Sequence, residues 1–133
     1  MAIFEAETAG VIVRAEPNFL DRESDPEEER YVWAYTIEIA NMRPEPVRLM
    51  HRYWRITDAA GMTQRVRGPG VIGKQPVIEP GEAFSYTSAC PLTTPAGMMH
   101  GAYDMVDLAD GAHFQVDIPA FALDSPFANR LAN

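Results

Sequence analysis

The stretch Tyr31–Asn41 alternates between large apolar residues and smaller or polar residues without a break. One face carries Tyr31, Trp33, Tyr35, Ile37 and Ile39, and the other carries Val32, Ala34, Thr36, Glu38 and Ala40. A period of two with aromatic and β-branched residues on one face is typical of a half-buried β-strand. We therefore predict a strand here whose aromatic face packs into a core.

Five further segments show the same period and are predicted as strands. The first is 11–15, and the second is Val47–Asp58, with Met50, Trp54 and Ile56 on one side. The third carries Phe84, Tyr86, Ser88, Cys90 and Leu92 on one face. The fourth is 101–108, with Tyr103 and Met105 on one side, and the fifth carries Phe114, Val116 and Ile118 on one face. Pro, Gly or Asp residues mark turns between them, at 42–46, 58–61, 79–82, 94–97 and 109–112.

Six to eight short strands with short connections predict an all-β fold, a fibronectin type III-like or immunoglobulin-like antiparallel β-sandwich. Pairing should be antiparallel, because parallel strands need long crossover connections. The 11 prolines and 9 glycines are spread along the chain and leave no long helical stripe. A length of 133 residues fits one domain over 1–133, with an acidic loop at 21–29 and a C-terminal tail from about 125 to 133.

The single cysteine, Cys90, excludes an intrachain disulfide and with it the disulfide-linked immunoglobulin pattern. Cys90 lies in the apolar run FSYTSACPL, so we interpret it as a buried structural thiol rather than a nucleophile. No stretch approaches the ~20 apolar residues that span a bilayer. The first ten residues, MAIFEAETAG, lack the basic and apolar regions of a signal peptide. We expect a cytoplasmic protein that does not enter a membrane.

The segment 21–30, DRESDPEEER, is the clearest loop and holds six acids in ten residues. We interpret it as a solvated connection that self-repulsion keeps open. A Ca²⁺ loop would need ligands at set spacings and a glycine at its sharp turn, and this run has neither. We therefore predict no metal site here.

Charge is distributed unevenly along the chain. Between Arg43 and Lys74 lie seven bases and two acids, a net of +5, whereas the whole chain carries −8 and the remainder therefore −13. This asymmetry indicates either a basic face that attracts an anion or acidic partner, or arginines that pair with acids on neighbouring strands. The acidic remainder argues against a nucleic-acid-binding protein.

Residues 68–73 read GPGVIG, so Gly68, Gly70 and Gly73 match the spacing G-x-G-x-x-G. In a dinucleotide-binding fold this motif opens a helix, but Pro76 and Pro80 forbid one here, and we reject that interpretation. A glycine-rich loop can still expose consecutive N–H groups to an anion. Flanking bases could then close over a phosphate; these are Arg65, Arg67 and Lys74. The alternative is that the glycines only permit a tight loop between strands.

The three histidines, His51, His100 and His113, lie in separate segments without ligand spacing, and no nucleophile elbow or HExxH motif occurs. We therefore expect neither catalysis nor a bound cofactor.

Several motifs in fixed order resemble one family over nearly the whole chain. The segments are RYVWAYTIEIAN, EPVRLMHRYWRITDAAG, VRGPGVIGKQPVIEPGEAFSYTSACPL, GMMHGAYDM and DGAHFQVDIPAFAL, and they look like the ApaG family. The resemblance implies a fibronectin type III-like sandwich in a bacterial protein associated with cobalt resistance and magnesium efflux. It makes the loop with Gly68, Gly70 and Gly73 a family feature and implies no enzymatic activity. The acidic run at 21–29 is longer and more charged than the family's usual turn.

From these observations we expect a non-enzymatic interaction module with a protein partner, or with a second copy of the chain as a homodimer. The alternative is a small-anion sensor for a nucleotide or pyrophosphate, which would use Gly68, Gly70, Gly73, Arg65, Arg67 and Lys74. A third hypothesis, direct binding of Mg²⁺ or Co²⁺, comes only from the family association, because the sequence holds no ordered ligand set.

Overall fold

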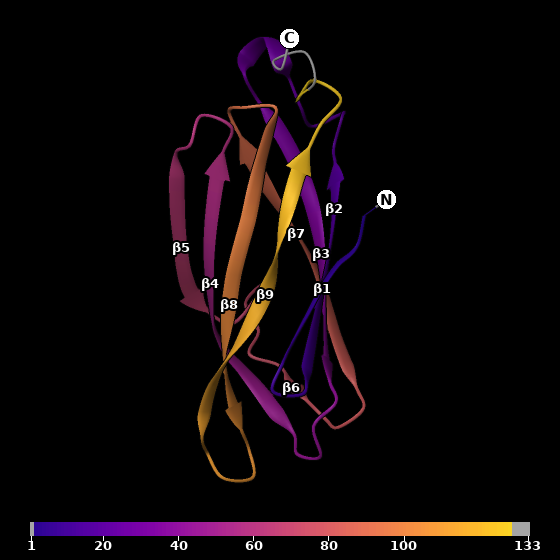
Figure 1. Cartoon of the computed structure of the whole chain (residues 1–133), viewed down its shortest axis with the longest axis vertical. Helices are drawn as coiled ribbons and strands as arrows, with labels where there is room; N and C mark the ends of the chain where they lie inside the picture. Colours follow the sequence, from indigo (N-terminus) through magenta and orange to yellow (C-terminus); the bar gives the residue numbers. More distant parts are fainter. Residues whose placement is uncertain (1, 129–133) are drawn as a thin grey trace.

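A computed structural model describes residues 2–128 of the chain and shows two antiparallel sheets packed face to face (Figure 1). The first sheet has the order β1-β2-β3-β7, formed by β1 (Phe4–Thr8), β2 (Val11–Phe19), β3 (Tyr31–Asn41) and β7 (Ala83–Leu92). The second has the order β5-β4-β8-β9, formed by β5 (Thr63–Pro69), β4 (Val47–Asp58), β8 (Ala96–Asp107) and β9 (His113–Asp124), with β6 (Val77–Ile78) also paired to β4. The predicted fibronectin type III-like sandwich is confirmed.

The core lies between the sheets and uses the predicted apolar faces. Trp33, Ile37 and Ile39 face inward from β3 and are almost fully buried. From the opposite sheet Trp54 contacts Tyr35 edge-to-face, with ring centroids 5.4 Å apart. Burying a large apolar side chain contributes roughly 1.5–3 kcal/mol, so these inward faces hold the two sheets together.

Two bulges interrupt the regular alternation in the second sheet. In β4 the pairing with β8 shifts between Leu49 and His51, which leaves Met50 as an extra residue. The predicted inner face of Met50, Trp54 and Ile56 is therefore wrong at its first member, because Val47 and Leu49 are buried before the bulge and Trp54 after it. In β9 the register shifts between Ile118 and Phe121, where Pro119 and Ala120 lie opposite the single β8 residue His100. Pro119 has no N–H to donate, which fits its place in a bulge.

Three strands were absent from the sequence prediction: β1, β5 and β6. β5 reads TQRVRGP, and among its residues only Val66 packs against the core. A strand at the edge of a sheet with one inward side chain has little hydrophobic alternation to reveal it. In addition, β2 continues past the predicted end at residue 15 as far as Phe19, and β8 begins at Ala96, inside the predicted turn 94–97.

The acidic segment 21–30 is exposed as predicted but has a defined backbone. It contains the 3-10 helix η1 (Pro26–Glu28), and Asp25 pairs with Arg30 across it. The Ser24 hydroxyl donates to the Leu20 carbonyl at 2.7 Å and accepts from the Val32 amide at 2.9 Å. Local hydrogen bonds, rather than charge repulsion alone, therefore set the shape of this turn. Of the predicted C-terminal tail, residues 129–133 lie outside the described residues.

No helix in the part of the chain that the structure describes is long and apolar enough to cross a membrane.

Candidate anion-binding site

The outward face of the second sheet carries a hollow whose residues come from four neighbouring strands. Strand register places Arg67 of β5 opposite Tyr53 of β4, Tyr53 opposite Ala102 of β8, and Ala102 opposite Asp117 of β9. Ala102 is small and stands between larger side chains, so the sheet surface is low at this point. We call this feature the basic hollow; it has a volume of about 480 Å³, and its lining includes Tyr53, Arg55, Arg65, Arg67, His100, Ala102, Asp104, Gln115 and Asp117.

Three exposed arginines form one side of the basic hollow. Arg55 stands directly opposite Arg65 across the β4–β5 pair, and Arg67 lies two residues further along β5 on the same face. Among residues 2–128 no carboxylate lies within ion-pair distance of any of the three. The Arg67 guanidinium lies 5.4 Å from the centroid of the Tyr53 ring. Like charges directly opposite each other destabilise a sheet pair, so a bound anion would relieve this repulsion.

Carboxylates and histidines form the other side of the basic hollow and its border. Asp117 lies 3.3 Å from His100 Nε2, and Asp104 lies 3.0 Å from both His51 Nδ1 and His113 Nδ1. Partial burial of Asp104 would raise its pKa, but the hydrogen bonds from the two histidines outweigh this effect and lower it. Asp104 therefore stays ionised at neutral pH, and the hollow is cationic towards β5 and anionic towards β9.

The glycine loop is folded back on itself beside this face. The Gly70 N–H donates to the Met50 carbonyl at 2.8 Å, and Val71 and Lys74 exchange backbone hydrogen bonds across a tight turn. The two central residues of that turn, Ile72 and Gly73, have φ of 44° and 76°, as a type I′ turn requires.

Arg52 occupies the approach to the first two glycines of the motif. Its guanidinium lies against Gly68 and donates to the carbonyls of Pro69 and Gly70, both at 3.0 Å. At this point the loop therefore presents carbonyl oxygens to the Arg52 guanidinium, rather than N–H groups to an anion. Its role in binding an anion through N–H groups stays a prediction.

The structure separates the predicted site residues into two groups. Arg65 and Arg67 lie on the outward face in the basic hollow, whereas Gly70, Gly73 and Lys74 belong to the folded loop. Gly68 belongs to β5 itself, and the Arg52 guanidinium occupies the space that a side chain at this position would need. An anion bound by the arginine side chains would therefore lie in the basic hollow, and one bound by backbone N–H groups would lie at the glycine loop, which is a different place.

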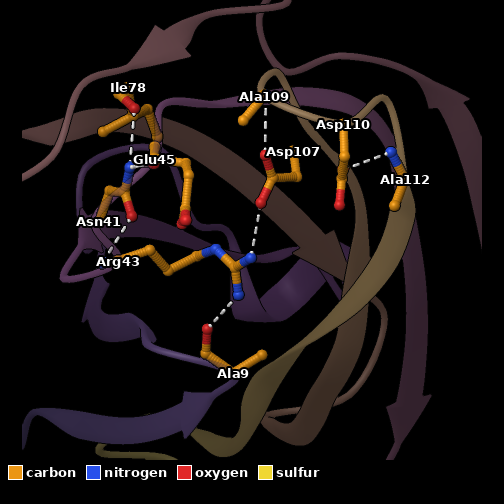
Figure 2. A network of polar contacts seen from close by, with 9 residues as sticks. All are labelled: Ala9, Asn41, Arg43, Glu45, Ile78, Asp107, Ala109, Asp110 and Ala112. Atoms are coloured by element: carbon orange, nitrogen blue, oxygen red, sulfur yellow. Dashed lines mark hydrogen bonds and ion pairs between the residues drawn. The ribbon is translucent and has the colours of Figure 1, made fainter.

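The remaining arginines of the +5 span have structural partners. Arg43 donates to Asp107 at 2.8 Å and to the Ala9 carbonyl at 2.7 Å, while Asn41 beside it contacts Glu45 and Ile78 (Figure 2). Arg48 donates to the Gln75 carbonyl at 3.0 Å, and Arg52 to the loop carbonyls described above. Ion pairing, the second interpretation of this span, therefore holds for Arg43, while Arg55, Arg65 and Arg67 form a basic face whose attraction for an anion stays a prediction.

Across residues 2–128, the nucleophilic and metal-binding side chains offer no competing site. Cys90 is buried in the core, and burial raises the pKa of its thiol to about 11. The hydroxyls of Tyr86 and Tyr103 contact each other in the core, where burial raises both of their pKa values. Among the residues that the structure describes, no three His, Cys, Asp or Glu side chains are grouped to hold a metal ion.

Of the residues that line the basic hollow, the sequence placed only Arg65 and Arg67 in a candidate site. Arg55 was counted in the basic span but not in the site, His100 was considered only as a possible metal ligand, and Tyr53 and Asp117 were not considered. The alternation within Val47–Asp58 already placed Tyr53 and Arg55 on the side opposite Trp54, which is the outward side. What was absent was β5, whose pairing with β4 brings Arg65 and Arg67 to the same face.

Comparison with known proteins gives consistent results along the chain. The sequence profile of the ApaG domain matches residues 21–107. The chain is 54% identical to Protein ApaG of Methylorubrum extorquens over 131 residues, covering 98% of this chain and 100% of that protein. It is 51% identical to Protein ApaG of Parvibaculum lavamentivorans over 129 residues, covering 97% and 98%.

A solved structure supports the same relationship in three dimensions. The crystal structure of the putative ApaA protein from Bordetella pertussis superposes with a TM-score of 0.84 at 44% identity, covering 87% of this chain and 94% of that one.

Proposed function

This chain belongs to the ApaG domain family, and from that premise we propose that it is a non-enzymatic binding module that recognises an anionic group at the basic hollow. The observation that carries the proposal is the set of three neighbouring arginines, Arg55, Arg65 and Arg67, without an ion-pair partner in residues 2–128. Arginine suits this role because its planar fork donates two parallel hydrogen bonds to a carboxylate or phosphate.

Several features support binding rather than catalysis. The only thiol, Cys90, is buried with a raised pKa and is a poor nucleophile. The histidines at the border of the basic hollow hydrogen-bond to carboxylates on the exposed sheet surface, and not to a hydroxyl that they would activate. A module of this kind would work in the cytoplasm, and the association with cobalt resistance and magnesium efflux would then be indirect, through what it binds.

The test removes the three charges and measures anion binding. Arg55→Gln/Arg65→Gln/Arg67→Gln should lose pyrophosphate affinity by at least about hundredfold, because hydrogen bonds to charged groups contribute roughly 1.5–3 kcal/mol each. Pyrophosphate at 100 times its Kd should stabilise the wild type by about 2.7 kcal/mol. The matched control, Arg14→Gln/Arg22→Gln/Arg30→Gln, removes the same charge outside the hollow and should bind like the wild type.

Stability gives the same experiment a second readout. Without ligand, the hollow variant should be at least as stable as the wild type, because like-charge repulsion across β4 and β5 is removed. A wild-type protein that shows no binding at millimolar pyrophosphate, or a hollow variant that binds as tightly as the wild type, would refute the proposal.

A second candidate function is association with a protein partner or with a second copy through a free sheet edge. β7 ends the first sheet and β5 ends the second, and such edges can pair with a strand of another chain. The solution mass, measured by sedimentation over a range of concentrations, tests self-association. A strictly monomeric chain that also retains no partner from cell extract would argue against this function.

A further inference from the structure

We propose that the basic hollow binds a phosphate ester, with the phosphate on Arg55, Arg65 and Arg67 and hydroxyl or amino groups of the organic part on Asp117. This inference rests on the proposed function and specifies its ligand. The ligand class follows from how charge is divided across the hollow, from its size, and from the net charge of the chain.

The cationic side matches one compact anion. Adjacent outward positions of a strand are about 7 Å apart, so Arg65 and Arg67, with Arg55 opposite, concentrate three guanidinium groups on a single small area of β4 and β5. A phosphate group presents several strong acceptor oxygens to such a cluster, and each guanidinium can engage two of them. The Arg67 guanidinium already lies over the Tyr53 ring, which limits its freedom before a ligand arrives.

The opposite side excludes a ligand that is anionic throughout. Asp117 lies across Ala102 from Tyr53, and Asp104 lies opposite Gln115 on the same outward face. A nucleic acid or an anionic membrane surface would place negative charge over these carboxylates, and the net −8 of the chain adds to the repulsion. A ligand with its charge at one end avoids this cost.

The carboxylate of Asp117 has acceptor capacity left for such a ligand. Its side chain is 53% exposed, and its contact with His100, at 3.3 Å, engages one oxygen. Asp104 is more fully engaged, since two histidines contact it. Hydroxyl or amino donors on the organic part of the ligand therefore find their acceptor at Asp117, with the Gln115 side chain beside it.

The size of the basic hollow fits a small molecule. Its volume of about 480 Å³ falls within the range of about 300–1,000 Å³ that is usual for small-molecule sites. The small side chain of Ala102 lies between Tyr53 and Asp117 in the register, and so between the arginines of β4 and β5 and the carboxylate of β9.

The experiment compares two phosphates of equal charge that differ in hydroxyl groups, namely ribose 5-phosphate and methyl phosphate. The wild type should bind ribose 5-phosphate about tenfold more tightly, which corresponds to one hydrogen bond to a charged acceptor. Asp117→Ala should abolish this preference while methyl phosphate binds at least as tightly as before, because a nearby negative charge is gone. Asp124→Ala removes the same charge further along β9, outside the hollow, and should keep the tenfold preference.

Two further probes identify the source of the ligand and separate the possible failures. If a nucleoside 5′-phosphate binds more tightly than ribose 5-phosphate, the base supplies additional donors and the ligand is a nucleotide. If the two bind with equal affinity, the ligand is a sugar phosphate. Arginine-dependent pyrophosphate binding without any preference for ribose 5-phosphate overturns this inference and leaves the proposed function intact. Binding of a polyglutamate peptide at the hollow, with no phosphate ester bound, overturns it in favour of an acidic protein partner.

Discussion

At the scale of single residues, Ile72 shows a side chain in a backbone conformation that does not suit it. Its φ is 44°, in the left-handed region that costs an L-residue roughly 1–2 kcal/mol and is rarest for β-branched side chains. The residue after it, Gly73, has φ 76° at no such cost. The turn closes because Val71 and Lys74 pair across it, with Val71 buried in the core.

Replacing Ile72 should therefore stabilise the protein. The Ile72→Asn variant creates the Asn-Gly pair that type I′ turns favour, and we expect the free energy of unfolding to rise by about 1 kcal/mol. The Ile72 side chain is 53% exposed, so little burial is lost. Urea denaturation measures the change. Gly73→Ala, which forces a side chain into positive φ where nothing lies within 4 Å of its added carbon, should destabilise. A destabilised Ile72→Asn protein would contradict this account of the turn.

At the scale of elements, sequence prediction succeeded where side chains alternate and failed where topology decides. β3 and β4 were predicted with their observed bounds because each carries a long alternating pattern. The β4 bulge at Met50 could not be foreseen, since an extra residue in one strand is defined only by its partner. The prediction of the site was incomplete for the same reason. Arg65 and Arg67 were included in it, but that Arg55 is their neighbour follows only from the pairing of β5 with β4.

A polar network at one end of the sandwich ties elements together that are far apart in the sequence. Asn41, at the end of β3, is fully buried and donates to the carbonyls of Glu45 and Ile78, both at 2.9 Å, while its side-chain oxygen accepts from the Arg43 amide (Figure 2). Arg43 in turn reaches Asp107 at the end of β8. This network fixes the connection from the first sheet to the second, and therefore the position of β4.

Asn41→Ala should destabilise the protein by about 3 kcal/mol, because three buried or partly buried backbone groups lose their partner. The measurement is equilibrium denaturation, with Asn18→Ala on β2 as the matched control that should stay within about 0.5 kcal/mol of the wild type. Asn41→Asp keeps the shape but cannot donate while ionised, so it should be less destabilised at pH 4 than at pH 7. Equal stability of Asn41→Ala and Asn18→Ala would show that the network contributes nothing.

At the scale of the whole molecule, charge is sorted by position. The acidic turn 21–30 lies at one end of the sandwich (Figure 1), while Arg55, Arg65 and Arg67 lie on the outward face of the second sheet. Two aspartates outside that turn have lowered pKa values: Asp107, chiefly through its hydrogen bond from Arg43, and Asp104, through its two histidines against the effect of burial. Both favour the folded state in their ionised form.

Stability should consequently fall in acid. A carboxyl group with a lowered pKa in the folded state contributes fully above its unfolded value of about 3.9, and this contribution is lost as pH falls through the folded pKa. We expect the free energy of unfolding to decrease below about pH 4, and Asp104→Asn/Asp107→Asn to decrease less steeply in the same window. Urea denaturation at a series of pH values gives both slopes. Parallel slopes for variant and wild type would contradict these pKa shifts.

The central claim is that this ApaG-domain protein binds an anionic group at the basic hollow. The most direct measurement is a titration of the isotope-labelled protein with pyrophosphate, followed by NMR of backbone amides and of arginine Nε–H groups. We predict saturable shifts at Arg55, Arg65 and Arg67, with the β1-β2-β3-β7 sheet unchanged. Shifts confined to residues 71–74 or to the first sheet, or no shift at millimolar pyrophosphate, would contradict the claim.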